Sequence, residues 1–352
     1  MKCSNCGGTM RFDVESQGLK CEYCGTVRKL PKPEEEAVIE DTDLSAAEEG
    51  AGKDWGVNRR TVTCKECGSV MFTSPEQISN ICPFCGSNII LSEEDTDFGI
   101  APSAIIPFSI TKEEVAKKYY YWNRFALWAP ESFRTGKVLG NMVGVYVPYW
   151  TFDADTVTSF SGKFGYTTDT RDGQTTQMRE RNGVVEKFID DVCICGSKRF
   201  FNDKLLNSVI SFKPEDLIPY TPDALAGFAA EKYTIGVDEA WNNAKQGAVR
   251  KRILHAACDH VGADSYDKKV QLSTEYSNVK FKYILVPVWL TACRYKGQVY
   301  NVVASGHNGK GNCRRPISTA KIILLILLLM GVFFIPIISM IIMSIVRVAM
   351  AG

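Results

Sequence analysis

Cys3-Ser4-Asn5-Cys6-Gly7 and Cys21-Glu22-Tyr23-Cys24-Gly25 open the chain, and the pattern returns as Cys64-Lys65-Glu66-Cys67-Gly68 and Cys82-Pro83-Phe84-Cys85-Gly86. The same spacing separates the two Cys-x-x-Cys pairs in both halves, so the halves align at all cysteines without a gap. Two such pairs present four thiolates to one tetrahedral metal ion. The glycine after every pair permits the positive φ that aims backbone N–H groups at the sulfurs. The spacing predicts two zinc ribbons and indicates a duplication of one small unit.

We expect each ribbon to hold one structural zinc ion, two in all. The predicted ligands are Cys3, Cys6, Cys21 and Cys24 in the first ribbon and Cys64, Cys67, Cys82 and Cys85 in the second. Four thiolates complete the zinc coordination and leave no position for a substrate, so the expected role is structural. Iron is the alternative metal, because the turn at Cys82 resembles that of rubredoxin. Each ribbon is too small for a core of its own, so the metal must supply its folding energy.

The charge balance hides a division of the chain into unlike segments. The 352 residues carry 41 basic and 40 acidic side chains, a net charge of +1 that argues against a protein coating nucleic acid. Thirteen cysteines behind no apolar leader indicate a reducing compartment. Residues 1–30 and 56–92 form the ribbons, and residues 31–55 between them are acidic. We interpret 31–55 as a solvated linker, with a docking tail for a basic partner as the alternative.

The C-terminal region contains a long apolar run without a single charge, 322–346. A helix of that length spans about 37 Å, enough to cross a bilayer, and we predict a transmembrane helix over 320–347. Four basic residues precede the run and one follows it: Lys310, Arg314, Arg315 and Lys321 before, and Arg347 after. The positive-inside rule therefore predicts a single-pass, tail-anchored protein of the cell membrane, with the N-terminal bulk cytoplasmic and the C-terminus outside.

Residues 98–313 are predicted to form an α+β domain, which makes the chain multidomain. A capping-box spacing opens a helix at Thr111 that we expect to reach Trp128. Further helices are predicted over 203–212, 222–233 and 238–262, and strands over 143–152, 268–278, 280–293 and 297–305, with Asp172-Gly173 at a hairpin turn. Val145–Trp150 resembles Ile284–Trp289, since both are apolar and carry proline and tryptophan. This likeness suggests an internal duplication of a β unit.

The middle domain shows no recognisable catalytic motif. The chain lacks a Gly-x-x-x-x-Gly-Lys-Ser/Thr phosphate loop, and we predict that it is not an enzyme. Four carboxylates could pair in space, although solvated strand ends are the simpler interpretation: Asp153, Asp155, Asp190 and Asp191. The five cysteines outside the ribbons are expected to be small buried hydrophobic side chains.

The chain resembles a bacterial family of membrane-anchored TFIIB-type zinc-ribbon proteins, some of which carry a helicase-like replication-restart label. The resemblance rests on the ribbons and on Ile105–Phe108, Gly144–Trp150, Phe152–Asp155, Leu225–Glu231 and Pro287–Trp289. The helicase label does not suit a chain without ATPase motifs. Similar proteins accompany SPFH-domain scaffolds, TPM-domain membrane proteins and phage-shock protein A homologues. The resemblance therefore implies a role in envelope stress or membrane recruitment.

We expect a non-enzymatic, membrane-anchored, zinc-binding adaptor or scaffold whose cytosolic ribbons dock a protein partner. Two alternatives remain open. One is a membrane-tethered nucleic-acid-binding regulator, which would show salt-sensitive DNA binding by residues 1–97. The other is an enzyme that uses carboxylates of the middle domain.

Overall fold

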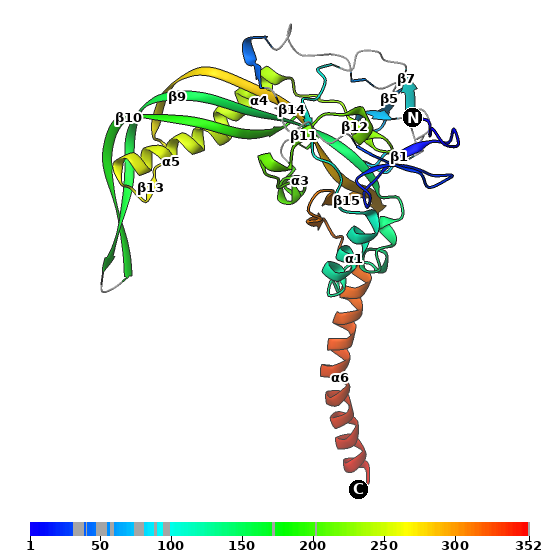
Figure 1. Ribbon diagram of the computed structural model, residues 1–352. Coiled ribbons are helices and arrows are strands. Elements are labelled where there is room, and N and C mark those ends of the chain that lie inside the picture. Colours follow the sequence, from blue (N-terminus) through cyan, green and yellow to red (C-terminus); the bar gives the residue numbers. More distant parts are fainter. Residues whose placement is uncertain are drawn as a thin grey trace.

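The computed structural model describes residues 1–30, 39, 41–46, 55–56, 60–73, 81–87, 90–93, 99–170, 173–200 and 203–350. A body built on a mixed β-sheet lies at the centre, a long curved arm projects to one side, and the helix α6 (Thr319–Met350) leaves the body as a separate rod (Figure 1). The structure contains two four-cysteine clusters in its N-terminal part, a sheet-rich middle region and one apolar C-terminal helix.

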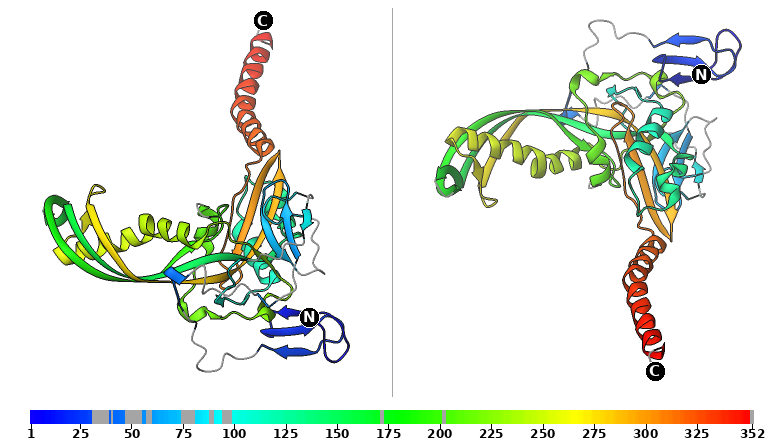
Figure 2. Two further views of the ribbon diagram at one scale, coloured as in Figure 1. Left: turned by 90° about the horizontal axis from the view of Figure 1, so that it is seen from above. Right: turned by 90° about the horizontal axis from the view of Figure 1, so that it is seen from below.

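The two ribbons attach to the body in different ways. In ribbon one, β1 (Met10–Asp13), β2 (Gly18–Cys21) and β3 (Val27–Lys29) form a three-stranded sheet of their own. In ribbon two, β5 (Arg60–Cys64), β6 (Val70–Thr73) and β7 (Ile90–Glu93) belong to the main sheet, because β6 pairs with β12 (Ala229–Glu231) of the body. In both views of Figure 2, ribbon one lies at the edge of the body, on the side opposite α6.

The main sheet is organised around two long antiparallel strands, β9 (Val143–Thr170) and β14 (Gln271–Tyr295). The two similar sequence stretches lie side by side in this pair, with Val147 opposite Val286. Each long strand also has a short parallel neighbour, β12 beside β9 and β8 (Ala104–Ile105) beside β14. In the chain, β8 precedes β9 in the first half of the body, and β12 precedes β14 in the second half. The short strand of each half therefore pairs with the long strand of the other half.

The two halves repeat the same contacts. Trp150 Nε1 donates to Ile235 O (2.9 Å) in one half, and Trp289 Nε1 donates to Ile110 O (2.8 Å) in the other. In the same way, Gly196 N donates to Pro148 O (2.8 Å), and Gly306 N donates to Pro287 O (2.9 Å). Each tryptophan ring also packs edge-on against an aromatic ring, that of Tyr233 for Trp150 and that of Phe108 for Trp289. An indole buried in this way needs an acceptor for its N–H, and both find it in the backbone just ahead of a helix.

The arm consists of the outer part of β9, the hairpin strand β10 (Gly173–Cys195) and the first part of β14. Its inner side is covered by one continuous helical segment, α4 (Val237–Ala244), a π turn (Lys245–Val249) and α5 (Arg250–Val261) (Figure 1). The arm has a separate small core of Phe160, Phe164, Leu254, Ala257, Cys258 and Val270. Bulges interrupt β10 between Ile189 and Val192 and β14 between Ser277 and Lys280, where the arm joins the body.

Shorter elements complete the fold. They are β4 (Thr42–Asp43), η1 (Leu44–Ala46), α1 (Lys112–Asn123), α2 (Glu131–Arg134), η2 (Lys137–Leu139), α3 (Lys204–Val209), η3 (Pro214–Asp216), β11 (Ile218–Pro219), η4 (Pro222–Leu225), β13 (Ser265–Tyr266), β15 (Gln298–Ser305) and β16 (Gly311–Cys313).

Several local predictions can be compared with these elements. The capping box is confirmed: the Thr111 hydroxyl accepts from Glu114 N, and the Glu114 carboxylate accepts from Thr111 N. The helix ends at Asn123, however, short of Trp128. The helix over 222–233 is wrong, because Gly227 adopts a φ of +92° and the chain turns from η4 into β12. The strands over 268–278 and 280–293 are one bulged strand, and Asp172 of the hairpin lies outside the described residues.

Parts of the acidic segment 31–55 contact the body. Thr42 and Asp43 pair with Phe281 and Lys280 on β14. Trp55 is 2% exposed and packs edge-on against Phe72, Tyr220 and Tyr283. The segment therefore has docked residues near its middle and at its end, and the rest of it lies outside the described residues apart from Ile39, Asp41 and η1.

The helix α6 is long and apolar enough, by length and composition, to cross a membrane. Its most apolar window has no buried residue, unlike the core helix of a soluble protein. The helix continues through Pro336, and Ser339 Oγ donates to the Pro336 carbonyl at 2.8 Å.

Candidate metal centres

All four Cys-x-x-Cys turns fold into the same knuckle. In each, the glycine that follows the pair has a φ between +69° and +72° and donates its N–H to the carbonyl of the first cysteine, at 2.8 to 3.0 Å. The glycines are Gly7, Gly25, Gly68 and Gly86. A side chain at this left-handed φ would be strained, which is why the sequence repeats glycine there. The knuckles turn both cysteines of a pair toward one point.

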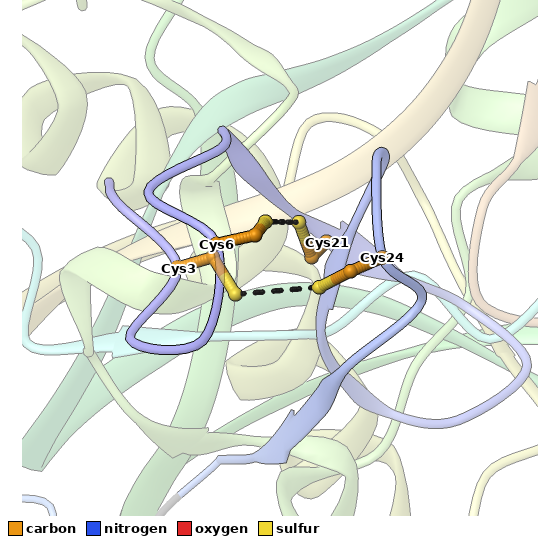
Figure 3. Close-up of side chains that lie close together, drawn as sticks. All are labelled: Cys3, Cys6, Cys21 and Cys24. Atoms are coloured by element: carbon orange, nitrogen blue, oxygen red, sulfur yellow. Dashed lines mark hydrogen bonds between the residues drawn. The ribbon is translucent and has the colours of Figure 1, made fainter.

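The knuckles bring the predicted ligands into two clusters of four. Within each cluster all sulfur atoms lie within 4.8 Å of one another. Figure 3 shows the first cluster, with Cys3 Sγ 3.7 Å from Cys24 Sγ and Cys6 Sγ 3.4 Å from Cys21 Sγ. In the second, Cys64 and Cys85 are 3.6 Å apart and Cys67 and Cys82 are 3.8 Å apart. A tetrahedron with metal–sulfur bonds of about 2.3 Å has edges of about 3.8 Å, so each cluster fits one zinc ion or another tetrahedral thiophilic ion.

Hydroxyl groups assist the thiolates in both clusters. Thr26 Oγ1 lies 3.1 Å from Cys24 Sγ, Ser69 Oγ lies 3.3 Å from Cys67 Sγ, and Ser87 Oγ lies 3.3 Å from Cys64 Sγ. Hydrogen bonds to the sulfur from the Thr26 hydroxyl, which has the larger effect, and from the Thr26 backbone N–H lower the pKa of Cys24 to about 6. A lowered pKa favours the thiolate form that a metal requires. The sequence carried this signal, since three of the four knuckles place Ser or Thr two residues after the second cysteine.

The two clusters differ in their surroundings. In cluster one, Cys3 and Cys21 are buried, whereas Cys6 and Cys24 are exposed. Tyr23, at the tip of the knuckle between Cys21 and Cys24, is 80% exposed. Ribbon one is held by its strand end, where Phe12 N bonds to Ala226 O and Arg28 pairs with Asp223 at 2.8 Å. Its metal end therefore faces solvent.

Cluster two lies inside the body. Three of its cysteines are buried in the same apolar cluster as Ile106, Val145, Tyr149 and Leu206. Phe84, within the second knuckle, is fully buried and packs on Phe200 at 5.5 Å between ring centroids. Arg199 donates to the Phe84 carbonyl at 3.1 Å and lies over its ring. A metal here would join ribbon two to the centre of the main sheet.

Glu231, on the strand β12 that links ribbon two to the body, is a buried carboxylic acid. It is 2% exposed; Oε1 accepts from Ser197 Oγ at 2.7 Å, and Oε2 has no partner among the described residues. Burial is the largest effect on this group and raises its pKa to about 7, although the Ser197 hydroxyl acts in the opposite direction. The folded protein thus holds a proton that the unfolded chain, with a Glu pKa of about 4.3, releases.

We expect Glu231→Gln to remove one pH dependence of stability. Because the folded pKa is raised, the contribution of Glu231 is complete at low pH and is lost as pH rises from about 4.5 to about 7, an effect of about 3 kcal/mol. Glutamine keeps an acceptor for Ser197 and no charge, so the variant should exceed the parent in stability at pH 8 and come close to it at pH 5. Denaturant unfolding of the full chain in detergent at both pH values measures the difference, and an equal difference at both would contradict the assignment.

The middle-domain carboxylates gather at the junction of body and arm. Lys282 Nζ lies 3.0 Å from Asp41, 3.3 Å from Asp191 and 3.6 Å from Asp153. Asp153 is buried and also accepts from Asp191 N at 2.6 Å. The interpretation of solvated strand ends is therefore wrong for Asp153, and the residue that sequence reasoning missed is Lys282. Of the five other cysteines, Cys195 and Cys258 are buried, whereas Cys193 is exposed.

Comparison with known proteins adds one similarity. The chain is 25% identical to a protein described as "Uncharacterized protein YdjG" of Bacillus subtilis (strain 168), over 330 residues that cover 91% of each chain. The similarity thus extends over most of the length of both chains. No protein-family model matches the chain. No solved structure matches it either.

Proposed function

We propose that this protein is a non-enzymatic, membrane-anchored adaptor that holds two structural zinc ions and uses ribbon one to dock a cytosolic protein partner. The observation that carries the proposal is the difference in solvent exposure between the two cysteine clusters. Cluster two is enclosed by the body, so its metal serves the fold. Cluster one shows two of its cysteines to solvent at the edge of the body opposite α6 (Figure 2).

The arrangement of the parts supports an adaptor. With α6 in a bilayer, ribbon one lies on the side of the body that faces away from the membrane. A knuckle held rigid by a metal ion loses little conformational entropy when a partner binds to it. Tyr23 at its tip is an exposed amphipathic side chain of the type that anchors protein interfaces. We assign the body and ribbons to the cytoplasm, because the basic residues flank α6 mainly on its N-terminal side.

The resemblance to TFIIB-type zinc-ribbon proteins supplies the candidate partners. Proteins with an SPFH domain, with a TPM domain, or similar to phage-shock protein A are the ones to examine first, in the setting of envelope stress or membrane recruitment. Docking of nucleic acid is the weaker alternative for ribbon one. Phosphate binding requires a basic surface, and a zinc ion with four thiolates adds a net charge of about −2 to this one.

We also infer that the body arose by duplication of one β unit. The support is the set of matched contacts around β9 and β14, in which the strand, the glycine, the tryptophan and the entry to a helix recur in both halves. Exchange of the short strands β8 and β12 between the halves is what a fused, strand-swapped dimer would leave.

Tyr23→Ala tests the docking proposal. The full chain is isolated from cross-linked native membranes, and SPFH-domain, TPM-domain and phage-shock protein A-like proteins are quantified in the isolate. We expect at least a fivefold loss of one of them with Tyr23→Ala and unchanged zinc content. Phe188→Ala is the matched control, since Phe188 is an aromatic residue 56% exposed on the arm. Equal recovery of all proteins from both variants would remove ribbon one as the docking surface.

A further inference from the structure

An aromatic surface lies where α6 leaves the body. Six large apolar side chains are exposed there, although they lie outside α6: Tyr120 (58%), Tyr121 (64%), Phe125 (76%), Leu127 (61%), Trp128 (46%) and Ile317 (63%). The first five belong to the end of α1 and the turn that follows it, which we call the aromatic turn (residues 120–128). Figure 1 shows α1 at the end of the body from which α6 emerges. Such a cluster on a soluble surface marks an interaction site.

The aromatic turn is fixed directly to the start of α6. Lys321 Nζ donates to the carbonyls of Leu127 (2.9 Å) and Ala129 (2.7 Å), and Ser318 N donates to Trp128 O at 2.8 Å. These three hydrogen bonds hold the turn level with the first turn of the apolar helix. Lys296 Nζ donates to Thr319 Oγ1 at 2.7 Å and fixes the same helix start from the neighbouring hairpin. If α6 spans a bilayer, this level is the water–lipid interface.

The side chains of the turn point in two directions. Val115, Tyr119 and Asn123 bury one face of α1 against the body. Tyr120 and Tyr121 are exposed on the part of α1 that does not pack on the body. Arg124, Phe125 and Trp128 lie in the turn after the helix and are exposed as well, so the aromatic side chains face outward. A helix that buries one face and still carries an aromatic stripe on the other is built to contact a second apolar phase.

The charges of this surface suit a phospholipid headgroup layer. The Arg124 guanidinium lies 3.9 Å from the centroid of the Tyr121 ring and 4.6 Å from that of Phe125. Arg314, next to the start of α6, keeps a side chain that is 66% exposed while pairing with Asp203. Residues 314–350 include no acidic side chain. Aromatic rings with cations among them are the composition that proteins place at the membrane interface, beside anionic phosphate groups.

We propose that the aromatic turn is a membrane-interface anchor: residues 120–128 insert their side chains into the headgroup layer of the bilayer that α6 crosses. The proposal rests on the membrane location of α6 proposed above. The occupant is lipid rather than a protein, because three hydrogen bonds fix the turn at the entry of α6, where the bilayer itself supplies the apolar phase. The anchor would set the height of the body over the membrane and restrict its rotation about α6.

The tryptophans of this chain provide the test. Trp55, Trp150, Trp241 and Trp289 are 8% exposed or less, α6 contains no tryptophan, and Trp128 is exposed in the turn. The full chain is reconstituted into nanodiscs of phosphatidylcholine and phosphatidylglycerol whose acyl chains carry bromine near the headgroup, a quencher of tryptophan emission. We expect quenching, and expect Trp128→Phe to remove at least half of the quenched emission. Trp122→Phe, which changes a less exposed indole in α1, should retain it.

A second variant tests insertion without changing the reporter. Phe125→Asp places a charge in the proposed interface and should reduce quenching of Trp128 at least twofold, whereas Phe188→Asp on the arm should leave it unchanged. Extraction of native membranes with alkaline carbonate separates the two proposals. Release of the parent protein would overturn the membrane location of α6. Retention of the protein together with quenching that is equal in the parent and in Trp128→Phe would overturn the interface anchor alone.

Discussion

Cys82→Ser should destabilise the whole body, and not only ribbon two. Cys82 is fully buried, lies 3.8 Å from Cys67 and belongs to the apolar cluster that includes strands of the main sheet. Loss of this ligand releases or weakens the metal and leaves three thiolates near the centre of the sheet, where unpaired charge is unfavourable. We expect a loss of about 3–5 kcal/mol in the free energy of unfolding, because loss of a metal is among the changes that give the largest effects of single substitutions.

Cys24→Ser is the matched control, since it also removes one of four thiolates but from the exposed cluster. It should lower the zinc content by about one ion per chain and leave the unfolding of the body close to that of the parent. Tryptophan emission follows the body, because Trp150 and Trp289 are buried in its core, and atomic absorption counts the metal. Equal destabilisation by the two substitutions would show that both clusters contribute equally to the stability of the body. It would contradict the proposal that cluster two stabilises the body and cluster one forms a docking surface.

Lys282→Met should be the most damaging single change away from the cysteines. The Lys282 side chain is 13% exposed and lies within 4.0 Å of carboxylate oxygens from Asp41, Asp153 and Asp191. Burial alone would lower the pKa of Lys282, but the Asp41 hydrogen bond and the charges of Asp191 and Asp153 raise it overall. Removing the cation leaves the three carboxylates without a positively charged partner at the junction of body and arm. We expect a loss of about 3–5 kcal/mol in the free energy of unfolding at neutral pH.

The loss should depend on pH, because the folded pKa of Asp153 is already raised, chiefly by burial. A raised carboxyl pKa favours the folded state at low pH, and that advantage is lost as pH rises through the folded value. Without Lys282 the pKa of Asp153 rises further, so the penalty of Lys282→Met should be several-fold smaller at pH 4 than at pH 8. Lys280→Met, an exposed lysine on the same strand, should change stability by about 0.5 kcal/mol or less. A penalty independent of pH would contradict this electrostatic account.

The two four-cysteine clusters and the apolar C-terminal helix could be predicted from the sequence because their signals are local. A cysteine pair and the glycine after it form one short turn and dictate one knuckle, and the uncharged run over 322–346 dictates one kind of helix. The capping box at Thr111 is of the same kind. The helix predicted over 222–233 failed for a related reason: a good apolar pattern was outweighed by one glycine at φ +92°.

What the sequence could not reveal depends on contacts between distant residues. Phe84 stands where ribbon one has Tyr23, but this local difference does not show what encloses ribbon two. The enclosure involves β12, which follows in the chain only after β9 and β10. Lys282 gives no signal by itself, since its three carboxylates come from three separate segments. The outward aromatic stripe of residues 120–128 has the pattern of one more buried helix face, and only its position beside α6 distinguishes it.

The exchange of short strands between the two halves of the body limits how the chain can be divided for study. β8 completes the sheet beside β14, and β12 completes it beside β9, while the central pair of Val147 and Val286 joins positions far apart in the chain. A fragment that ends before β12, or one that begins after β8, would leave a long apolar strand with an open edge, a template for aggregation. Such long-range pairing also predicts slow folding. Truncated expression products should therefore keep ribbon two and residues 99–313 together, because β6 of ribbon two pairs with β12. Deletion of ribbon one or of α6 is safer than any cut within the body.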